Sequence, residues 1–130
     1  MDVKERYHYW IDLADYDLET AKAMLKTKRF LYIGFMCHQS IEKAIKAYHW
    51  RKTETEPAYI HNLLRLAEQS GLINEFNEKH TTLINELNPL NIEARYPRAK
   101  EELLKALNLK KCKSLLNQTE ELLKWIKIKS

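Results

Sequence analysis

Glycine and proline are scarce in this sequence: two glycines and three prolines occur among 130 residues. Tight hairpins and phosphate-binding loops depend on glycine, so the sequence has little material for either. An all-α fold is therefore expected. A chain of this length fits one domain, residues 1–130, whose core needs neither disulfides nor metal.

Cysteine is also scarce, and long apolar runs are missing. Cys37 and Cys112 fall in different predicted helices and form neither a C-x-x-C pair nor a zinc-binding series, so two packed, reduced thiols are expected. The N-terminus, MDVKERYHYW, carries charges where a signal peptide has its apolar segment. No apolar run approaches the roughly 20 residues of a membrane-spanning helix. These absences predict a soluble, cytoplasmic protein without membrane association.

Positive charge gathers near the C-terminus. The formal net charge is +4, and residues 98–130 contain nine Lys or Arg against four Glu. Such an excess attracts RNA, nucleotide phosphates or an acidic partner, yet this segment lacks the interleaved aromatic residues of a base-stacking surface. A solvated lysine surface is the favoured interpretation.

Apolar residues recur at helical spacing along most of the chain. Helices are predicted over about residues 2–28, 30–51, 60–70, 73–87 and from 109 onwards, with a brief helical turn over 98–107. Asp2 and Asn108 are expected N-caps, and Gly71 is an expected C-terminal stop. The predicted architecture is an up-and-down antiparallel four-helix bundle with an additional short helix.

The second predicted helix, FLYIGFMCHQSIEKAIKAYHWR, has the clearest pattern. Its apolar stripe predicts a helix buried along most of its length and contains Ile33, Cys37, Ile41, Ala44 and Tyr48. A polar row with a spacing of four contains His38, Glu42 and Lys46, with Gln39 and Lys43 beside it. An ion pair between Glu42 and Lys46 on a solvated face is the simplest interpretation of this row.

Three motifs occur in order along the chain: QSIEKAIKA at residues 39–47, His61-Asn62-Leu63, and Ala94-Arg95-Tyr96-Pro97. Together with WIDLADYDLETAKAML at residues 10–25, they resemble the HEPN domain family over nearly the whole chain. The resemblance implies nucleotide binding and a homodimer that acts with a minimal nucleotidyltransferase, as in a toxin–antitoxin pair. Gly34, which we expect to allow close approach by the first helix or a second subunit, fits such an interface, as do Tyr7, Tyr9, Tyr16 and Tyr32.

The same resemblance would bring the polar residues of these motifs into a cleft for an anionic ligand, a nucleotide or RNA. Cationic side chains would hold phosphates, and His61 would bond to a sugar or base. The expected ligand-binding residues are Gln39, Glu42, Lys43, Lys46, His61, Arg95 and Tyr96. In an alternative, architectural interpretation, His61 anchors its loop and Arg95 pairs with Glu42.

No cofactor or metal is expected. A metal site made by His38, Glu42 and His61 is conceivable because residues four apart on a helix can chelate a cation. It is disfavoured because the neighbouring Lys43 and Lys46 would repel the ion.

Catalytic HEPN proteins cleave RNA without metal through an Arg-x4-6-His motif, assisted by a polar or acidic residue on the second helix. Arg95 matches the arginine and Glu42 the acid, but no histidine follows His80. The resemblance therefore favours a non-catalytic binding module. The alternative is a ribonuclease toxin in which Glu42, His61 and Arg95 carry the chemistry.

Overall fold

The computed structural model describes the backbone of residues 1–91 and 97–130 and the side chains of residues 1–91 and 101–130. Within these residues the chain forms α-helices and 3-10 helices and no strand, which confirms the all-α prediction. The helices are α1 (Val3–Met24), α2 (Phe30–Thr53), α3 (Leu63–Ser70), η1 (Leu72–Glu75), α4 (Glu78–Leu87), η2 (Asn88–Leu90), α5 (Pro97–Ala106) and α6 (Leu109–Lys129). No helix in the described part of the chain is long and apolar enough to cross a membrane.

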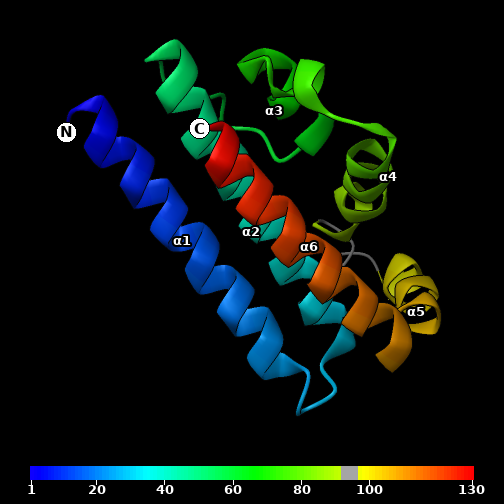
Figure 1. Ribbon diagram of the computed structural model, residues 1–130. Coiled ribbons are helices and arrows are strands. Elements are labelled where there is room, and N and C mark those ends of the chain that lie inside the picture. The colour runs from blue at the N-terminus through cyan, green and yellow to red at the C-terminus, as the bar shows by residue number, and fades with distance from the viewer. Residues whose placement is uncertain (92–96) are drawn as a thin grey trace.

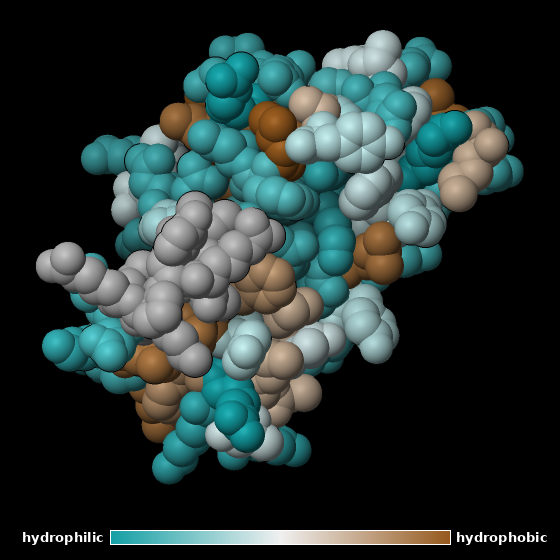
Figure 2. Space-filling model, turned by 180° about the vertical axis from the view of Figure 1, so that it is seen from behind, coloured by the Kyte–Doolittle hydropathy of each residue, from teal (hydrophilic) through white to brown (hydrophobic). Residues whose placement is uncertain are grey.

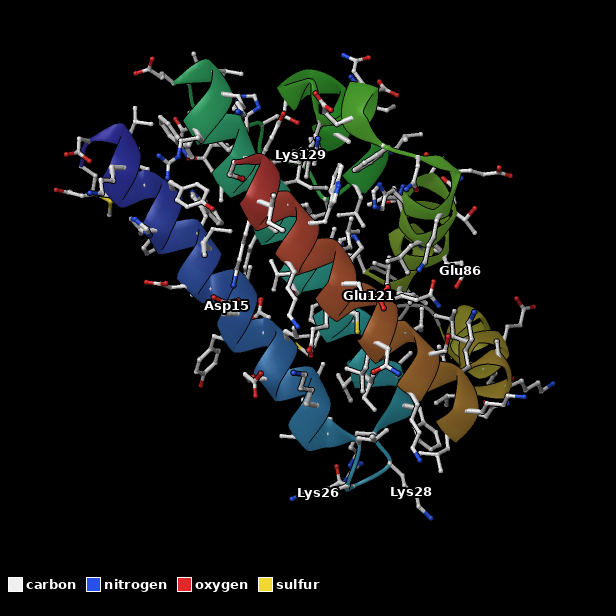
Figure 3. All side chains as sticks on the ribbon, in the orientation of Figure 1. Asp15, Lys26, Lys28, Glu86, Glu121 and Lys129 are labelled. Atoms are coloured by element: carbon white, nitrogen blue, oxygen red, sulfur yellow. The ribbon has the colours of Figure 1, made fainter. Side chains whose placement is uncertain are left out.

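Helices α1 and α2 form an antiparallel pair, and α6 packs against both (Figure 1). Two ion pairs show that α6 runs antiparallel to α1: Lys127 Nζ lies 2.6 Å from Asp15 Oδ1, and Lys22 pairs with Glu120. Figure 3 shows Asp15 on the length of α1 that lies beside α6. The shorter helices α3, α4 and α5 lie on the other side of α6 (Figure 1). The predicted up-and-down bundle is confirmed, and α2 contacts each of the other α-helices described.

The apolar stripe predicted for α2 forms the centre of the core. Ile33, Cys37, Ile41, Ala44 and Tyr48 are all buried, and leucine and isoleucine residues of α3, α4 and α6 pack in the same cluster. Burying one such side chain stabilises the fold by about 1.5–3 kcal/mol. Both cysteines are buried free thiols, and burial raises the pKa of Cys37 to about 12. Packing therefore accounts for the cysteines.

Local capping decides where the helices begin and end. The Asp2 carboxylate accepts the Glu5 N–H at 2.8 Å, and the Asn108 side chain accepts the Lys111 N–H at 2.9 Å, so both predicted N-caps are confirmed. Gly71 ends α3 with φ +82°. The third helix begins at Leu63 rather than at residue 60, because Asn62 has extended backbone and caps it.

The predicted helix over residues 73–87 is divided in the structure. Asn77 has extended backbone and forms a capping box with His80, so η1 ends before it and α4 begins after it. The apolar spacing across this region is helical, but the reciprocal caps favour a new start at Asn77.

The expectation that the first helix approaches Gly34 closely is wrong, and the approach of a second subunit stays a prediction. A Cβ at this position would lie 3.0 Å from Leu90 Cδ1 and 3.4 Å from Leu107 Cδ1, so the close neighbours belong to η2 and the α5–α6 connection. Gly34 and Tyr7 are buried within the chain, whereas Tyr9, Tyr16 and Tyr32 are exposed. On the rear face, seen in Figure 2, hydrophobic residues lie in small groups among hydrophilic ones.

Gly71→Ala is expected to destabilise the protein. A Cβ at φ +82° costs about 1–2 kcal/mol, although nothing lies within 4 Å of it to clash. Thermal unfolding should show a melting temperature lower by about 3–8 °C. Gly71→Asn is the matched control, since asparagine tolerates this conformation better and should lose less. An alanine variant as stable as the wild type would contradict this account of the α3 end.

Candidate functional site

A buried carboxylate organises the polar row of α2. The Oε1 atom of Glu42 accepts a hydrogen bond from His61 Nδ1 at 2.9 Å, and Oε2 accepts one from Lys46 Nζ at 3.2 Å. Glu42 is 3% exposed and Lys46 is 6% exposed. The interpretation of this row as a solvated face is therefore wrong: the loop over residues 54–62 turns back at the left-handed Glu54 and places His61 against α2.

His38 lies one turn before Glu42 and fixes the backbone of this loop. Its Nε2 donates to the carbonyl oxygen of His61 at 3.0 Å, which leaves Nδ1 without a proton in the neutral ring. Nδ1 is buried 3.9 Å from Glu42 Oε1 and has no hydrogen-bond partner among the described residues. Burial lowers the pKa of His38 to about 4. His38 is therefore a neutral residue that positions His61.

His61 itself connects the buried cluster with solvent. Because Nδ1 donates to Glu42, the neutral imidazole keeps an unprotonated Nε2, and 59% of the side chain is exposed. A carboxylate that orients an imidazole in this way leaves the second nitrogen free to accept a proton or a hydroxyl hydrogen bond. The exposed edge of the cluster is thus the His61 imidazole.

Of the other predicted site residues, two contact other parts of the chain and two lie outside the described residues. Lys43 forms an ion pair with Asp17 of α1 and so points away from Glu42. Gln39 Nε2 donates to Asn91 Oδ1 at 2.7 Å. Arg95 and Tyr96, predicted to bind ligand, lie outside the described residues. The structure therefore brings Glu42, Lys46 and His61 together and places Lys43 in the interface with α1.

A pocket next to the cluster was not predicted. It lies where α1, α2 and the loop over residues 54–62 meet, and Lys46 lines it together with Arg6, Trp10 and Trp50. Arg6 and Trp10 are four residues apart on one helix, as are Lys46 and Trp50 on the other. That spacing is visible in the sequence, but it gives no sign that the two pairs meet.

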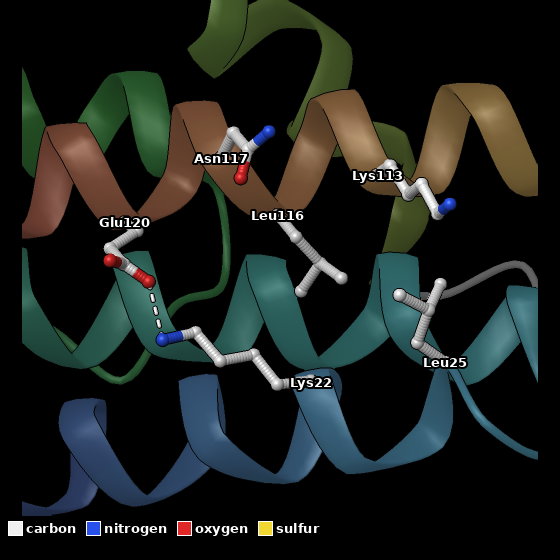
Figure 4. Close-up of a pocket in the computed structure, with 6 residues that line it drawn as sticks. All are labelled: Lys22, Leu25, Lys113, Leu116, Asn117 and Glu120. Carbon is white, nitrogen blue, oxygen red and sulfur yellow. Dashed lines mark ion pairs between the residues drawn. The ribbon is translucent and has the colours of Figure 1, made fainter.

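A second hollow, of about 330 Å³, lies between α1 and α6 (Figure 4). Lys22 and Glu120 pair across it, beside Leu25 and Leu116. Lys22 and Glu120, two of the three charged residues that line it, satisfy each other, so it offers a ligand less than the Glu42 cluster does. Among the residues whose side chains are placed, no group of three His, Cys, Asp or Glu could hold a metal ion.

Comparison with known proteins agrees with this architecture. Residues 7–129 match the HEPN domain family, and the protein belongs to that family. A solved structure with the same fold is TT1696 from Thermus thermophilus, with a TM-score of 0.81 and 19% sequence identity over 96% of this chain and 98% of that one. No curated protein matches the sequence significantly. At this identity the structural likeness establishes the fold, and function must be argued from the site.

The buried neutral His38 makes stability depend on pH. Because its folded-state pKa is about 4 against an ordinary value near 6.5, the unfolded chain takes up a proton that the folded chain refuses. The free energy of unfolding should therefore fall as the pH is lowered from about 6.5 towards 4, with a contribution from this residue of up to about 3 kcal/mol. Urea unfolding at several pH values measures the effect.

His38→Gln is the control for this prediction, because an amide N–H can still donate to the His61 carbonyl without titrating. Burial also lowers the pKa of His49 and His80, so both proteins should lose stability in acid. The variant should lose less. If the free energies of unfolding of the wild type and the variant fall in parallel as the pH is lowered, protonation of His38 costs no stability and the prediction is wrong.

Proposed function

We propose that this HEPN protein is a non-catalytic module that binds a nucleotide or RNA at the Glu42–Lys46–His61 cluster. In this proposal it acts as a homodimer with a minimal nucleotidyltransferase partner, in a toxin–antitoxin-like pair. The observation that carries the binding proposal is that a loop residue and two α2 residues meet in one hydrogen-bonded cluster with an exposed edge. Dimerisation and the partner follow from family resemblance alone.

The chemistry of the cluster suits a ribose phosphate. In the tautomer that donates Nδ1–H to Glu42, Nε2 of His61 can accept from a sugar hydroxyl, and the Lys46 ammonium attracts a phosphate oxygen. Glu42 neutralises part of that ammonium charge, so a single phosphate is held weakly unless further cations contribute. Arg95, which the motif places in the same site, stays a predicted contributor.

A ribonuclease is the second candidate, and a specific observation favours it. The Glu42–His61 pair has the geometry of an oriented general base: a carboxylate holds Nδ1 of an imidazole whose side chain is 59% exposed. Such a base could remove the proton from a ribose 2′-hydroxyl in place of the histidine that the Arg-x4-6-His motif would supply. Arg95 would stabilise the charged phosphorane.

Ligand binding is tested by thermal shift and direct titration with ATP, other nucleotides and short RNA. A ligand at a hundred times its dissociation constant should stabilise the protein by about 2.7 kcal/mol, a visible rise in melting temperature. Lys46→Ala and His61→Asn should each weaken binding. Lys43→Gln is the matched control, because Lys43 is on the same helix but pairs with Asp17. If none of these ligands binds to the folded protein, the proposal is refuted.

Incubation with RNA separates the two candidates. The binding module leaves RNA intact. If instead the wild type cleaves RNA and both Glu42→Gln and His61→Asn abolish cleavage while remaining folded, the protein is a ribonuclease and the non-catalytic proposal is wrong. Cleavage that survives both substitutions would point to a contaminating nuclease.

A further inference from the structure

An aromatic pocket of about 270 Å³ adjoins the Glu42 cluster. Arg6, Tyr9 and Trp10 from the start of α1 form one side, and Lys46 and Trp50 from the second half of α2 form another. The loop closes the pocket with Tyr59. Figure 1 shows why these segments meet: the antiparallel pairing of α1 and α2 brings the beginning of one beside the end of the other.

Two cations in this pocket already lie on aromatic rings. The guanidinium carbon of Arg6 is 4.5 Å from the centroid of the Trp50 ring, and Lys46 Nζ is 5.5 Å from the centroid of the Trp10 ring. A cationic ligand would have to displace them against charge repulsion. Glu56 also lines the pocket, and its carboxylate accepts a hydrogen bond from the Tyr59 hydroxyl at 2.7 Å. The lining side chains therefore carry two cations against one carboxylate, an excess of positive charge that suits a flat, uncharged ring with an anionic group.

Lys46 lines the pocket and also belongs to the buried cluster. Its ammonium lies 3.2 Å from Glu42 Oε2, and Glu42 in turn bonds to His61. Tyr59, in the pocket wall, is two residues before His61 on the same loop. A ligand with a ring in the pocket would therefore have its polar part near Lys46, from which Glu42 leads on to His61.

We propose that this pocket receives one nucleobase, which stacks among its aromatic side chains while the attached ribose and phosphate reach Lys46, Arg6 and His61. This inference rests on the function proposed above and adds the part of the ligand that is recognised. A volume near the lower limit of about 300 Å³ for ligand pockets suits one base rather than two. Tyr9 is 51% exposed and Tyr59 is 87% exposed. Both rings lie outside the hydrophobic core, so they can stack on a base without disturbing it.

The base in the pocket can belong to a free mononucleotide or to a single-stranded RNA. The probes are therefore AMP, a short oligoadenylate, and tripolyphosphate, which has phosphate without a base. Trp10 and Trp50 line the pocket, whereas Trp125 packs against His80 and Phe76 and is not among the lining residues. Trp125→Phe thus leaves a protein whose tryptophan fluorescence reports on the pocket alone.

In this Trp125→Phe background, AMP or oligoadenylate should quench the fluorescence, and tripolyphosphate should not. Tyr59→Ser and Trp10→Leu should each raise the dissociation constant for the adenine ligands at least fivefold, since base stacking is lost. Tyr16→Ser, an exposed tyrosine of α1 away from the pocket, is the control and should bind as the parent does. Quenching by oligoadenylate alone supports the inference and identifies an RNA strand as the source of the base.

Two results would overturn the inference, and they differ in what else they refute. If adenine ligands bind and Lys46→Ala weakens them, but neither Tyr59→Ser nor Trp10→Leu changes the dissociation constant, the binding function stands and the base lies elsewhere. If none of the probes binds folded protein, the inference fails, and the titration with the other nucleotides and RNA decides whether the binding function fails with it. Tyr59 is exposed, so its substitution keeps the test valid even if Trp10→Leu unfolds the protein.

Discussion

The carboxylate of Glu42 lies in the middle of the most buried helix, and the arrangement of the site depends on which hydrogen-bond donors reach it. A buried carboxylate without partners would cost several kcal/mol, so hydrogen-bond donors must reach it. One donor, Lys46, comes from the next turn of α2, but the other, His61, comes from the loop. That loop must therefore fold back over the helix. His38 strengthens the constraint because it holds the backbone at the same residue.

Burial of α2 on nearly all sides explains why its polar residues connect elements rather than face water. Ser40 Oγ donates to the Ala14 carbonyl at 2.8 Å, Lys43 pairs with Asp17, and Gln39 donates to Asn91. Each of these contacts holds α2 against another part of the chain. At His61 and the adjoining pocket, by contrast, polar groups next to the helix reach an open edge where a ligand could contact them.

Binding and catalysis would use the same residues of this site, so the fold alone does not choose between them. A Glu–His pair can hold a ribose hydroxyl or remove its proton. What separates the two outcomes is whether a phosphate is held in line with that hydroxyl, which requires cations at fixed positions. In this chain Lys46 is partly neutralised by Glu42, and a catalytic role would depend on Arg95 for the missing charge. The choice between binding and catalysis therefore depends on the chemistry of the site and not on family membership.

The sequence by itself determined the helices, because their signals are local. Apolar periodicity, the caps at Asp2 and Asn108, and the stop at Gly71 each depend on residues within a few positions, and all are present in the structure. Where periodicity and capping disagreed, as at Asn77, the local hydrogen bonds outweighed the apolar pattern.

Only the tertiary structure decided which polar residue meets which. From the sequence, Lys43 and Lys46 were equal candidates for a ligand, yet their different directions around α2 give one to Asp17 and the other to Glu42. The sequence likewise did not predict the neighbours of Gly34 or the pocket between α1 and α2. Such contacts join residues far apart in the chain, and they depend on how whole helices pack, which no local pattern specifies.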